Sequence, residues 1–585
     1  MIRARHAAAV FAALAHGLYT AADLRANPLA AHLLHDAARY DAWARAIVSG
    51  TAFEAGAYSQ APLYPLLVAG VYAVLGPRPA AVFVLQAVLG AAAVLLVGRA
   101  AERAGGASAG AWGAWLLALY GVPAFFETKL LPASLVFFLV ALFVERAGAC
   151  AASSGARPLA ALGGTLGALT IANAGSMLLL ALTLGWIAWD ASRPPRRRVV
   201  RVGLCLGAAL AVVAPVTVRN LAVSGELVPV ATNGGITFWQ GNNPNARGVY
   251  STPDGFSGAI ATQRAEARRV AEAESGRPMS DADASRYWFA RGRAQLLAHP
   301  GDTAALLGRK LMLVIASAEQ PLEYSSRLDA NPFRRAMPLP FAALAALAVA
   351  GLAPALRLRA AQPAVLAAAA TAATLLAFYV ASRYRLAMVP ALALIAALGA
   401  VRLRDREASR STAAAAAAVA AISLAWFPAT QGDLARGQDA MALCDRGTAL
   451  RESGRIPEAI EDYRRSIALA PEYPFAHLDL AKALTRAGRP DEARREIEEA
   501  VRLQPALAVA RFDLGVLLFE SGRIAEAAES FAEAFRLAPD DADAGNNLAG
   551  SYLELGRVEE AREVVRRMRE AGLPVDPPLA AATGR

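Results

Sequence analysis

Long apolar blocks fill the first three quarters of the chain, and a repeating amphipathic pattern fills the remainder. A helix that crosses the hydrocarbon core of a membrane needs about 20 mostly apolar residues. Blocks near this length lie at 7–24, 61–76, 80–99, 109–126, 130–145, 159–189, 199–217, 336–356, 362–381, 385–401 and 412–428. With about one crossing per block, the pattern predicts an all-α, polytopic transmembrane domain of about 11 spans over residues 1–430.

The block 159–189 decides on which side of the membrane the later segments lie. Asn173, Gly175 and Ser176 stand at its middle, so it could form one tilted span or two short ones. As a single crossing, it places the basic clusters at 193–201, 357–359 and 402–406 on the cytoplasmic side, in agreement with the positive-inside rule. We therefore take it as one span. Segments 25–60 and 218–335 and the C-terminal region are then expected on the outer side.

Residues 437–572 repeat a pattern every 34 positions. Glycine recurs at 454, 488, 522 and 556, alanine at 459, 493, 527 and 561, and proline at 471, 505 and 539. This resembles the tetratricopeptide family, in which each repeat is a helix–turn–helix. Residues 431–573 are predicted to stack as an α-solenoid of about four repeats, and 574–585 to be a disordered tail. Such an array binds a protein partner, or only docks the membrane part.

Composition agrees with a membrane protein and excludes some function classes. Only 18% of the 585 residues are charged, whereas about 25% is usual in soluble domains. The net charge of +10 could suggest nucleic-acid binding, but the basic clusters flank apolar blocks, so we expect no nucleic-acid partner. The three cysteines, Cys150, Cys205 and Cys444, have neither metal-binding nor disulfide spacing, and we expect no metal and no cofactor.

The segment "HDAARYDAWARAIVSG", residues 35–50, follows the first apolar block and predicts an amphipathic helix on the outer surface. Its apolar face would consist of Ala37, Tyr40, Trp43, Ala44 and Ile47.

The two aspartates of this helix differ in position. Asp36 shares a face with Tyr40, four residues on, and lies at the helix start, where a carboxylate can cap free N–H groups. Asp41 lies four residues before Arg45 and could be its solvated ion-pair partner.

Two arginines stand at the outer boundary of a span, in "SRYR". Arg383 and Arg385 lie where the positive-inside rule disfavours them. A guanidinium binds phosphate in bidentate fashion, so these arginines could hold an anionic ligand. Alternatively, they extend to lipid headgroups.

Over residues 7–405 the chain resembles the GT-C membrane glycosyltransferases, most closely glycosyltransferase family 39 with the bacterial protein mannosyltransferase-like enzymes. The similar segments are "DAARY" at 36–40 with Ala44, "PLYP" at 62–65, "RNLAVSGELVPVATNGGITFWQGNNPNARGVY" and "SRYRLAMVP". The resemblance implies transfer of a sugar from a polyprenyl-phosphate donor to an unknown acceptor on the outer face of the bacterial inner membrane. It implies that Asp36 is the catalytic base. Arg383, Arg385 and Arg219 would stabilise the phosphate leaving group.

The chain also departs from the family pattern. Ala37 replaces a second acidic residue, and Gln60 with the following Ala-Pro replaces a Lys-Pro-Pro sequence. Asp41, Glu54 or Gln60 could therefore replace a family contact, and Asp41 remains an alternative catalytic residue. The residues expected to bind substrate are Tyr40, Gln60, Tyr64, Trp239, Asn242 and Asn243. Trp239 offers a stacking face and the asparagines offer amides for sugar hydroxyls, although the same composition is typical of ordinary turns.

Three other functions remain open. An O-antigen ligase or polymerase would share the lipid-linked donor but would use a late outer loop. A non-enzymatic scaffold would act in envelope assembly through its tetratricopeptide repeats, with those repeats outside the cytoplasm. A transporter is disfavoured because no relay of intramembrane carboxylates is evident.

Overall fold

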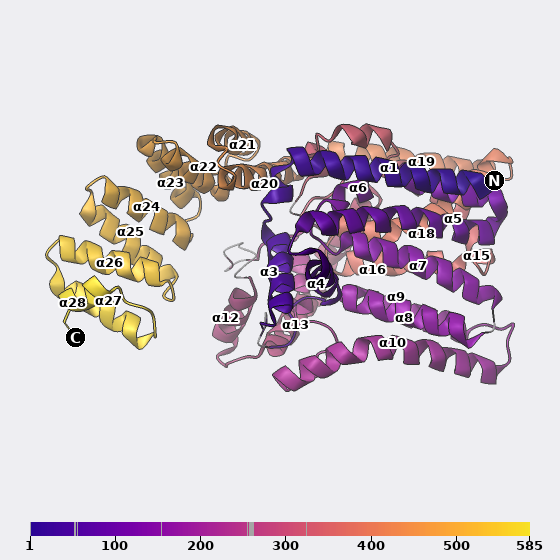
Figure 1. Ribbon diagram of the computed structural model, residues 1–585, viewed down its shortest axis with the longest axis horizontal. Helices are drawn as coiled ribbons and strands as arrows, with labels where there is room; N and C mark the ends of the chain where they lie inside the picture. Colours follow the sequence, from indigo (N-terminus) through magenta and orange to yellow (C-terminus); the bar gives the residue numbers. More distant parts are fainter. Residues whose placement is uncertain are drawn as a thin grey trace. The chain divides into compact units, whose positions relative to one another are not determined.

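The computed structural model describes residues 2–51, 54, 56–153, 155–253, 256, 263–322 and 324–584 (Figure 1). Within these residues every regular element is a helix, and the one β-type pairing is an isolated bridge between Tyr120 and Pro338. The chain divides into two compact units, Met1–Ala435 (unit 1) and Arg436–Arg585 (unit 2). The all-α prediction is confirmed, and the predicted boundary near residue 430 lies close to the observed one.

Unit 1 is a bundle of long helices with a cap of shorter ones. Its α-helices are α1 (Ile2–Ala26), α2 (Pro28–Ala31), α3 (His35–Ser49), α4 (Leu63–Leu75), α5 (Pro79–Ala118), α6 (Val122–Glu127), α7 (Ala133–Ala152), α8 (Ala156–Ala172), α9 (Met177–Ala188), α10 (Pro195–Ser224), α11 (Gly234–Asn242), α12 (Gln263–Ser275), α13 (Asp281–Ala298), α14 (Pro300–Ile315), α15 (Phe341–Arg357), α16 (Gln362–Ala377), α17 (Ser382–Arg385), α18 (Val389–Arg404) and α19 (Arg410–Thr430). Short 3₁₀ helices are η1 (Ala174–Ser176), η2 (Ser326–Leu328), η3 (Pro332–Ala336) and η4 (Leu386–Met388).

Six helices of the described residues are long and apolar enough to cross a membrane, judged by length and composition. They are Arg3–Ala26, Pro79–Ala118, Ala133–Ala151, Pro195–Ser224, Ser382–Arg404 and Arg410–Thr430. The shorter apolar helices are Leu63–Leu75, Ala174–Ala188, Phe341–Arg357 and Gln362–Ala377.

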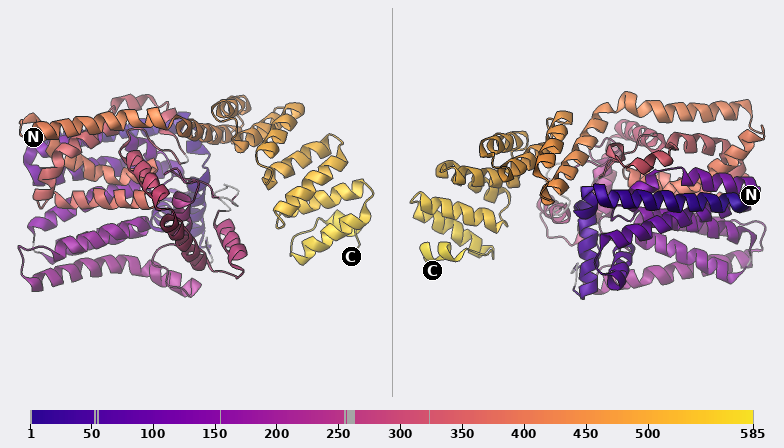
Figure 2. Two further views of the ribbon diagram at one scale, coloured as in Figure 1. Left: turned by 180° about the vertical axis from the view of Figure 1, so that it is seen from behind. Right: turned by 45° about the horizontal axis from the view of Figure 1, so that its top comes forward.

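The three basic clusters meet at one end of unit 1, which we call the basic end. Arg359 pairs with Asp190 at 3.1 Å, and Asp190 also pairs with Arg193. Arg404 contacts Ser108 at 3.2 Å. The long connections, including 225–340, gather at the opposite end with α3, which we call the loop end (Figure 2). A common end is what the positive-inside interpretation requires of these clusters, and their cytoplasmic side stays a prediction.

Helix α5 is a hairpin of two antiparallel helices. Its backbone leaves helical geometry at Gly105 and Gly106, where Gly106 has φ +77°. Beyond this turn the chain doubles back, because a Cβ on Gly113 would lie 2.9 Å from that of Ala101. The separate blocks predicted at 80–99 and 109–126 are these two arms.

The predicted span at 61–76 is wrong. Helix α4 crosses α3 at the loop end and does not run along the long helices of the bundle (Figure 1). Two tyrosines of α4 contact neighbouring residues of α3: the Tyr64 ring meets that of Tyr40, and the Tyr72 hydroxyl donates to Asp41 at 2.6 Å. With 13 residues, α4 is also shorter than the about 20 that a crossing needs.

The single crossing at 159–189 is also wrong, because this region forms α8, η1 and α9. Helices α8 and α10 run parallel: Gly163 packs on the Cys205 carbonyl and Gly167 on that of Ala209. After η1 the chain reverses into α9 and returns to the basic end, where Arg193 donates to the Ser153 carbonyl at 3.2 Å. The helices of this region therefore differ from the prediction, and the side of a membrane on which the later segments lie stays a prediction.

Unit 2 is a stack of helix pairs, as predicted. Its helices are α20 (Gly432–Glu452), which begins in unit 1, α21 (Ile456–Leu469), α22 (Pro474–Arg486), α23 (Pro490–Leu503), α24 (Ala508–Glu520), α25 (Ile524–Leu537), α26 (Ala542–Glu554), α27 (Val558–Glu570) and α28 (Pro577–Ala582). The recurring glycines have φ between +71° and +78° at the turn inside each pair, a conformation in which glycine has no steric penalty. The recurring alanines are fully buried where paired helices approach closely.

The predicted disordered tail at 574–585 is wrong over the described residues to 584. Helix α28 packs against α26. Asn546 accepts a hydrogen bond from the Asp576 amide at 3.1 Å, and Arg562 donates to the Thr583 carbonyl. The segment caps the last repeat, whose outer face would otherwise be exposed.

We predict that Gly351→Ala destabilises unit 1, because α15 and α18 cross in contact at Gly351 and Gly399. A Cβ on Gly351 would lie 1.8 Å from the Ile395 carbonyl oxygen. The expected loss is about 1–3 kcal/mol, measured by thermal unfolding in detergent. Gly207→Ala on α10 is the control, because a Cβ there meets nothing within 4 Å. Equal melting temperatures for the two variants would contradict the crossing.

Candidate functional site

A buried ion pair joins Asp36 of α3 to Arg383 of α17. The Asp36 Oδ2 lies 3.0 Å from the Arg383 Nη2, and both side chains are about nine-tenths buried. The Asp36 Oδ1 accepts a hydrogen bond from the Gln60 Nε2 at 3.2 Å. Three residues singled out separately in the sequence therefore meet at the loop end. The Asp36 carboxylate serves this cluster and is not the helix cap, which is Leu34 with no side-chain hydrogen bond.

The position of Asp36 follows from the amphipathic pattern of α3. Ala37, Tyr40, Trp43 and Ala44 are buried, as predicted. Asp36 extends the same face at the N-terminal end of the helix, so burial of the apolar stripe carries the carboxylate inward. The Tyr40 ring packs edge-on against Tyr64 at a centroid distance of 5.2 Å, which fixes the face against α4.

The Arg383 side chain is held by its neighbour. Its Nη2 contacts the Tyr384 hydroxyl at 2.9 Å, and its guanidinium lies 4.9 Å from the centre of the Tyr384 ring. A guanidinium presents several N–H groups in a plane and stays charged at every physiological pH. The cluster therefore places a guanidinium, a carboxylate and an amide within one site, which suits binding of an anion beside a proton acceptor. The Gln60 Oε1 is buried and has no hydrogen-bond partner.

Arg385, predicted to bind donor phosphate, has a structural environment instead. It is 1% exposed and its Nη2 lies 2.8 Å from the Glu319 Oε1. Its Nη1 donates to the Ala316 carbonyl just after α14, and its guanidinium covers the Phe341 ring at 4.2 Å. Residues two apart on a helix point to nearly opposite sides. Helix α17 therefore directs Arg383 to the site and Arg385 to the core.

Arg219 is likewise structural. Its guanidinium donates to the carbonyls of Gly56 at 2.7 Å and Glu54 at 2.9 Å, and stacks over the Tyr58 ring at 4.0 Å. It therefore fixes the segment that leads to Gln60. Tyr64, a predicted substrate contact, is fully buried and donates to Gln86 at 2.9 Å. Tyr40 is buried against it, so both tyrosines support the site.

Trp239 and the asparagines of "GNNPNARG", residues 241–248, are predicted to bind sugar but are engaged within the protein. Trp239 packs on Trp288 and beneath the Arg291 guanidinium. Asn242 donates to the carbonyls of Phe238 and Ala377, at 2.8 and 2.7 Å. Asn243 accepts from the Asn245 amide at 2.9 Å, as in an Asx turn. Trp239 and Asn242 thus lie within α11, and Asn243 alone fits the alternative interpretation of an ordinary turn.

Asp41 is separate from the cluster. It pairs with Arg45 at 2.6 Å, as its spacing predicted, and it accepts from the Tyr72 hydroxyl. Glu54 also has structural partners, since it accepts from the Ser59 amide at 2.8 Å and pairs with Arg39.

Sequence reasoning missed two buried polar contacts between α1 and the segment around α6. Lys129 pairs with Asp23 at 2.9 Å, and His16 lies 3.0 Å from Glu127. A Cβ on Gly90 would lie 1.9 Å from the Glu127 carboxylate, so this glycine makes room for the pair. The carboxylates of Asp23 and Glu127 have separate basic partners, and only the fold brings the members of each pair together.

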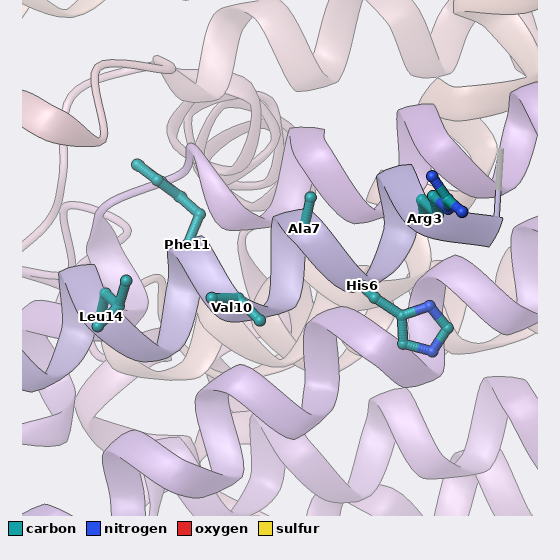
Figure 3. Close-up of a pocket in the computed structure, with 6 residues that line it drawn as sticks. All are labelled: Arg3, His6, Ala7, Val10, Phe11 and Leu14. Atoms are coloured by element: carbon teal, nitrogen blue, oxygen red, sulfur yellow. The ribbon is translucent and has the colours of Figure 1, made fainter.

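A surface hollow lies along the exposed side of α1, lined by Arg3, His6, Ala7, Val10, Phe11 and Leu14 (Figure 3). None of these residues belongs to the Asp36 cluster. Val10 and Leu14 are about 60% exposed, as expected for side chains that face lipid. In the described part of the chain, no group of three or more His, Cys, Asp or Glu side chains could hold a metal.

We predict that Arg385→Met destabilises the protein by about 3–5 kcal/mol, because it leaves the Glu319 carboxylate buried without its cation. Thermal unfolding in detergent measures this loss. The double variant Arg385→Met with Glu319→Leu should recover much of it. If Arg385→Met melted like the wild type, the arginine would be available for a ligand and the structural role would be wrong.

Comparison with known proteins assigns unit 2 only. Models of the tetratricopeptide repeat match residues 444–508, 478–541 and 518–584, and no family model covers the N-terminal part. No curated protein matches the chain.

Solved structures similar to the chain include the first tetratricopeptide domain of Spaghetti (RPAP3) bound to an HSP90 peptide. It is 24% identical, and the match covers 20% of this chain and 95% of that one, with a TM-score of 0.20. The first domain of human RPAP3 is 23% identical over 21% and 98% of the two chains, with a TM-score of 0.20. MamA is 29% identical over 23% and 78%, with a TM-score of 0.21. On the family models, residues 444–584 are tetratricopeptide repeats.

Proposed function

We propose that unit 1 transfers a sugar from a polyprenyl-phosphate donor to an acceptor hydroxyl. The observation that carries this proposal is the Asp36–Arg383 pair, which combines a proton acceptor and an anion-binding group in one site. The resemblance of residues 7–405 to GT-C glycosyltransferases supports it, because that resemblance assigns these two residues complementary roles. The candidate site consists of Asp36, Arg383 and Gln60. Arg385, Arg219, Trp239 and the asparagines are left out because each has structural partners.

In the proposed reaction, Asp36 acts as the base and Arg383 stabilises the leaving group. The Asp36 carboxylate takes the proton of the acceptor hydroxyl as its oxygen attacks the anomeric carbon. The bond from that carbon to the phosphate oxygen breaks, and its electron pair stays on the lipid phosphate. Arg383 stabilises the negative charge that develops there. The products are the glycosylated acceptor and polyprenyl phosphate.

The two roles require the ion pair to open when the donor binds. The donor phosphate and the Asp36 carboxylate compete for the same guanidinium. Contact with phosphate would release the Asp36 Oδ2 for the acceptor, while Gln60 continues to orient the Oδ1. Before the donor binds, the pair satisfies two buried charges that would otherwise be costly.

A membrane location for unit 1 is part of the proposal. The six long apolar helices and the exposed apolar side of α1 support it. The basic end would face the cytoplasm and the loop end, with Asp36, the outside. The chain leaves unit 1 at the loop end, where Arg327 donates to the Ala435 carbonyl at 3.1 Å. Unit 2 would then lie outside the cytoplasm.

A second candidate is a scaffold that acts through unit 2. The observation that favours it is the tetratricopeptide array itself, which is typical of protein–protein interaction. In that case the Asp36 cluster would only stabilise the fold. An O-antigen ligase or polymerase would share the donor but place its chemistry in the later connection, where the candidate residues are engaged in packing.

We predict that Asp36→Asn lowers sugar transfer at least 100-fold, because an amide cannot accept the proton of the acceptor. The assay follows a radiolabelled sugar from polyprenyl phosphate in membranes that contain the full chain. Asp41→Asn on the same helix is the matched control and should keep more than half of the activity.

Equal transfer by Asp36→Asn and the wild type would exclude the proposed mechanism. Loss in Asp41→Asn alone would move the base to that residue. If no variant and no wild-type chain transfers sugar, while binding through unit 2 persists, the scaffold is favoured.

A further inference from the structure

Lys310 of α14 is a buried cation that no sequence feature singled out. It is 0% exposed. Its Nζ donates three hydrogen bonds: to the Asn242 Oδ1 at 2.8 Å, to the Leu376 carbonyl at 3.0 Å and to the Phe378 carbonyl at 2.6 Å. Each of the three ammonium protons therefore has an acceptor.

The two carbonyl acceptors belong to the end of α16. The last carbonyls of a helix lack intrahelical partners and carry partial negative charge, so a cation there is favourable. Asn242 completes the contact by donating to the Ala377 carbonyl at 2.7 Å. The close fit extends to Gly241, where a Cβ would lie 2.0 Å from the Phe378 carbonyl oxygen.

The segment that follows this helix end carries Arg383. Its backbone is held at two further points: the Val380 amide donates to the Gly248 carbonyl at 2.9 Å, and the Ser382 amide to the Gln320 carbonyl at 2.8 Å. Gly248 itself packs against the Lys310 side chain. Lys310 thus contacts both the start of the segment 378–382 and one of its anchors.

We propose that Lys310 is a positioning residue, whose Nζ donates to the end of α16 and thereby holds Arg383 against Asp36. A benefit for catalysis rests on the proposed function, whereas the hold on the segment does not. Without the Nζ, three buried oxygens would lose their donor at the turn that joins α16 to α17.

Lys310 is surrounded by few charges. Helices α11 and α16 contain no ionisable residue, and Arg410 is the one charged residue of α19. Arg309 on α14 and Arg293 on α13 are exposed, and Arg291 on α13 is engaged with Glu274. The nearby titratable groups Tyr250 and Tyr379 pack on each other. Burial alone lowers the pKa of Lys310 from 10.5 to about 7.

Because of this burial, the free energy of local opening around Lys310 depends on pH, and its sign follows from the lowered pKa. Between pH 7 and 10.5 the buried Lys310 side chain is largely a neutral amine, which still donates two hydrogen bonds, and it becomes an ammonium when exposed, so local opening takes up a proton. Raising the pH in this window therefore disfavours opening, by up to about tenfold per pH unit.

Hydrogen exchange of residues 378–385 in the full chain tests the proposal. Lys310→Met should lower the protection of this segment at least tenfold at pH 7. The control is Lys482→Met, which removes an ion pair with Asp513 in unit 2 and should leave the segment unchanged. In the wild type, protection corrected for intrinsic exchange should rise more than tenfold from pH 7 to 9, and Lys310→Met should abolish this rise.

Two results would overturn the proposal: unchanged protection in Lys310→Met, or a flat pH profile in the wild type. The wild-type profile decides even if the variant fails to fold. Because exchange involves no sugar donor, a failed transfer assay would contradict the proposed function and leave the role of Lys310 intact.

Discussion

The salt bridge between Asp36 and Arg383 is the contact on which the arrangement of the loop end depends. It joins the first long connection of unit 1 to the short turn before α18, so it brings together parts of the sequence that are far apart. Several further contacts hold either the segment that carries Asp36 or the segment that carries Arg383. Arg219 fixes the segment before Gln60, the Tyr40–Tyr64 contact fixes α3, and Lys310 fixes the turn before Arg383. Two buried charges of opposite sign need such support, since a small displacement would leave both desolvated and unpaired.

Local periodicity predicted the elements whose partners lie nearby in sequence. The helix at 35–49, its buried face and the Asp41–Arg45 pair all follow from spacings of three and four residues. The four recurring turns of unit 2 follow from glycine at a fixed step, because that backbone conformation is strained for other residues. In both cases the determining interaction lies within one or two helical turns, or within one repeat.

Features that depend on distant partners were not predictable. Hydropathy cannot distinguish α4, which packs across α3, from a helix that runs the length of the bundle, because both bury apolar side chains. Nor can it show that α8 and α9 reverse at Asn173, since the reversal depends on α10 packing parallel to α8. Among the site residues, composition could not separate Arg383 from Arg385. Only the direction of each side chain assigns one to the site and the other to Glu319.

The buried pairs on α1 extend the same principle into the apolar part of unit 1. Asp23 with Lys129 and His16 with Glu127 are each nearly inaccessible to solvent. Charges in such surroundings are tolerated only when paired. These pairs fix the rotation of α1 and its position along its axis against the segment around α6. Helix α1 leads through the short α2 to α3, so α1 and α4 both help to determine the position of Asp36.

In the proposed reaction, the donor phosphate displaces the Asp36 carboxylate from the Arg383 guanidinium. Binding of polyprenyl phosphate to the full chain in nanodiscs tests it most directly, with the wild type, Asp36→Asn and Arg383→Gln compared. If the exchange occurs, Asp36→Asn binds the lipid phosphate about tenfold more tightly than the wild type, a gain of about 1.4 kcal/mol, because its competitor is gone. Arg383→Gln then binds at least tenfold more weakly. Equal affinity of all three proteins would contradict the account.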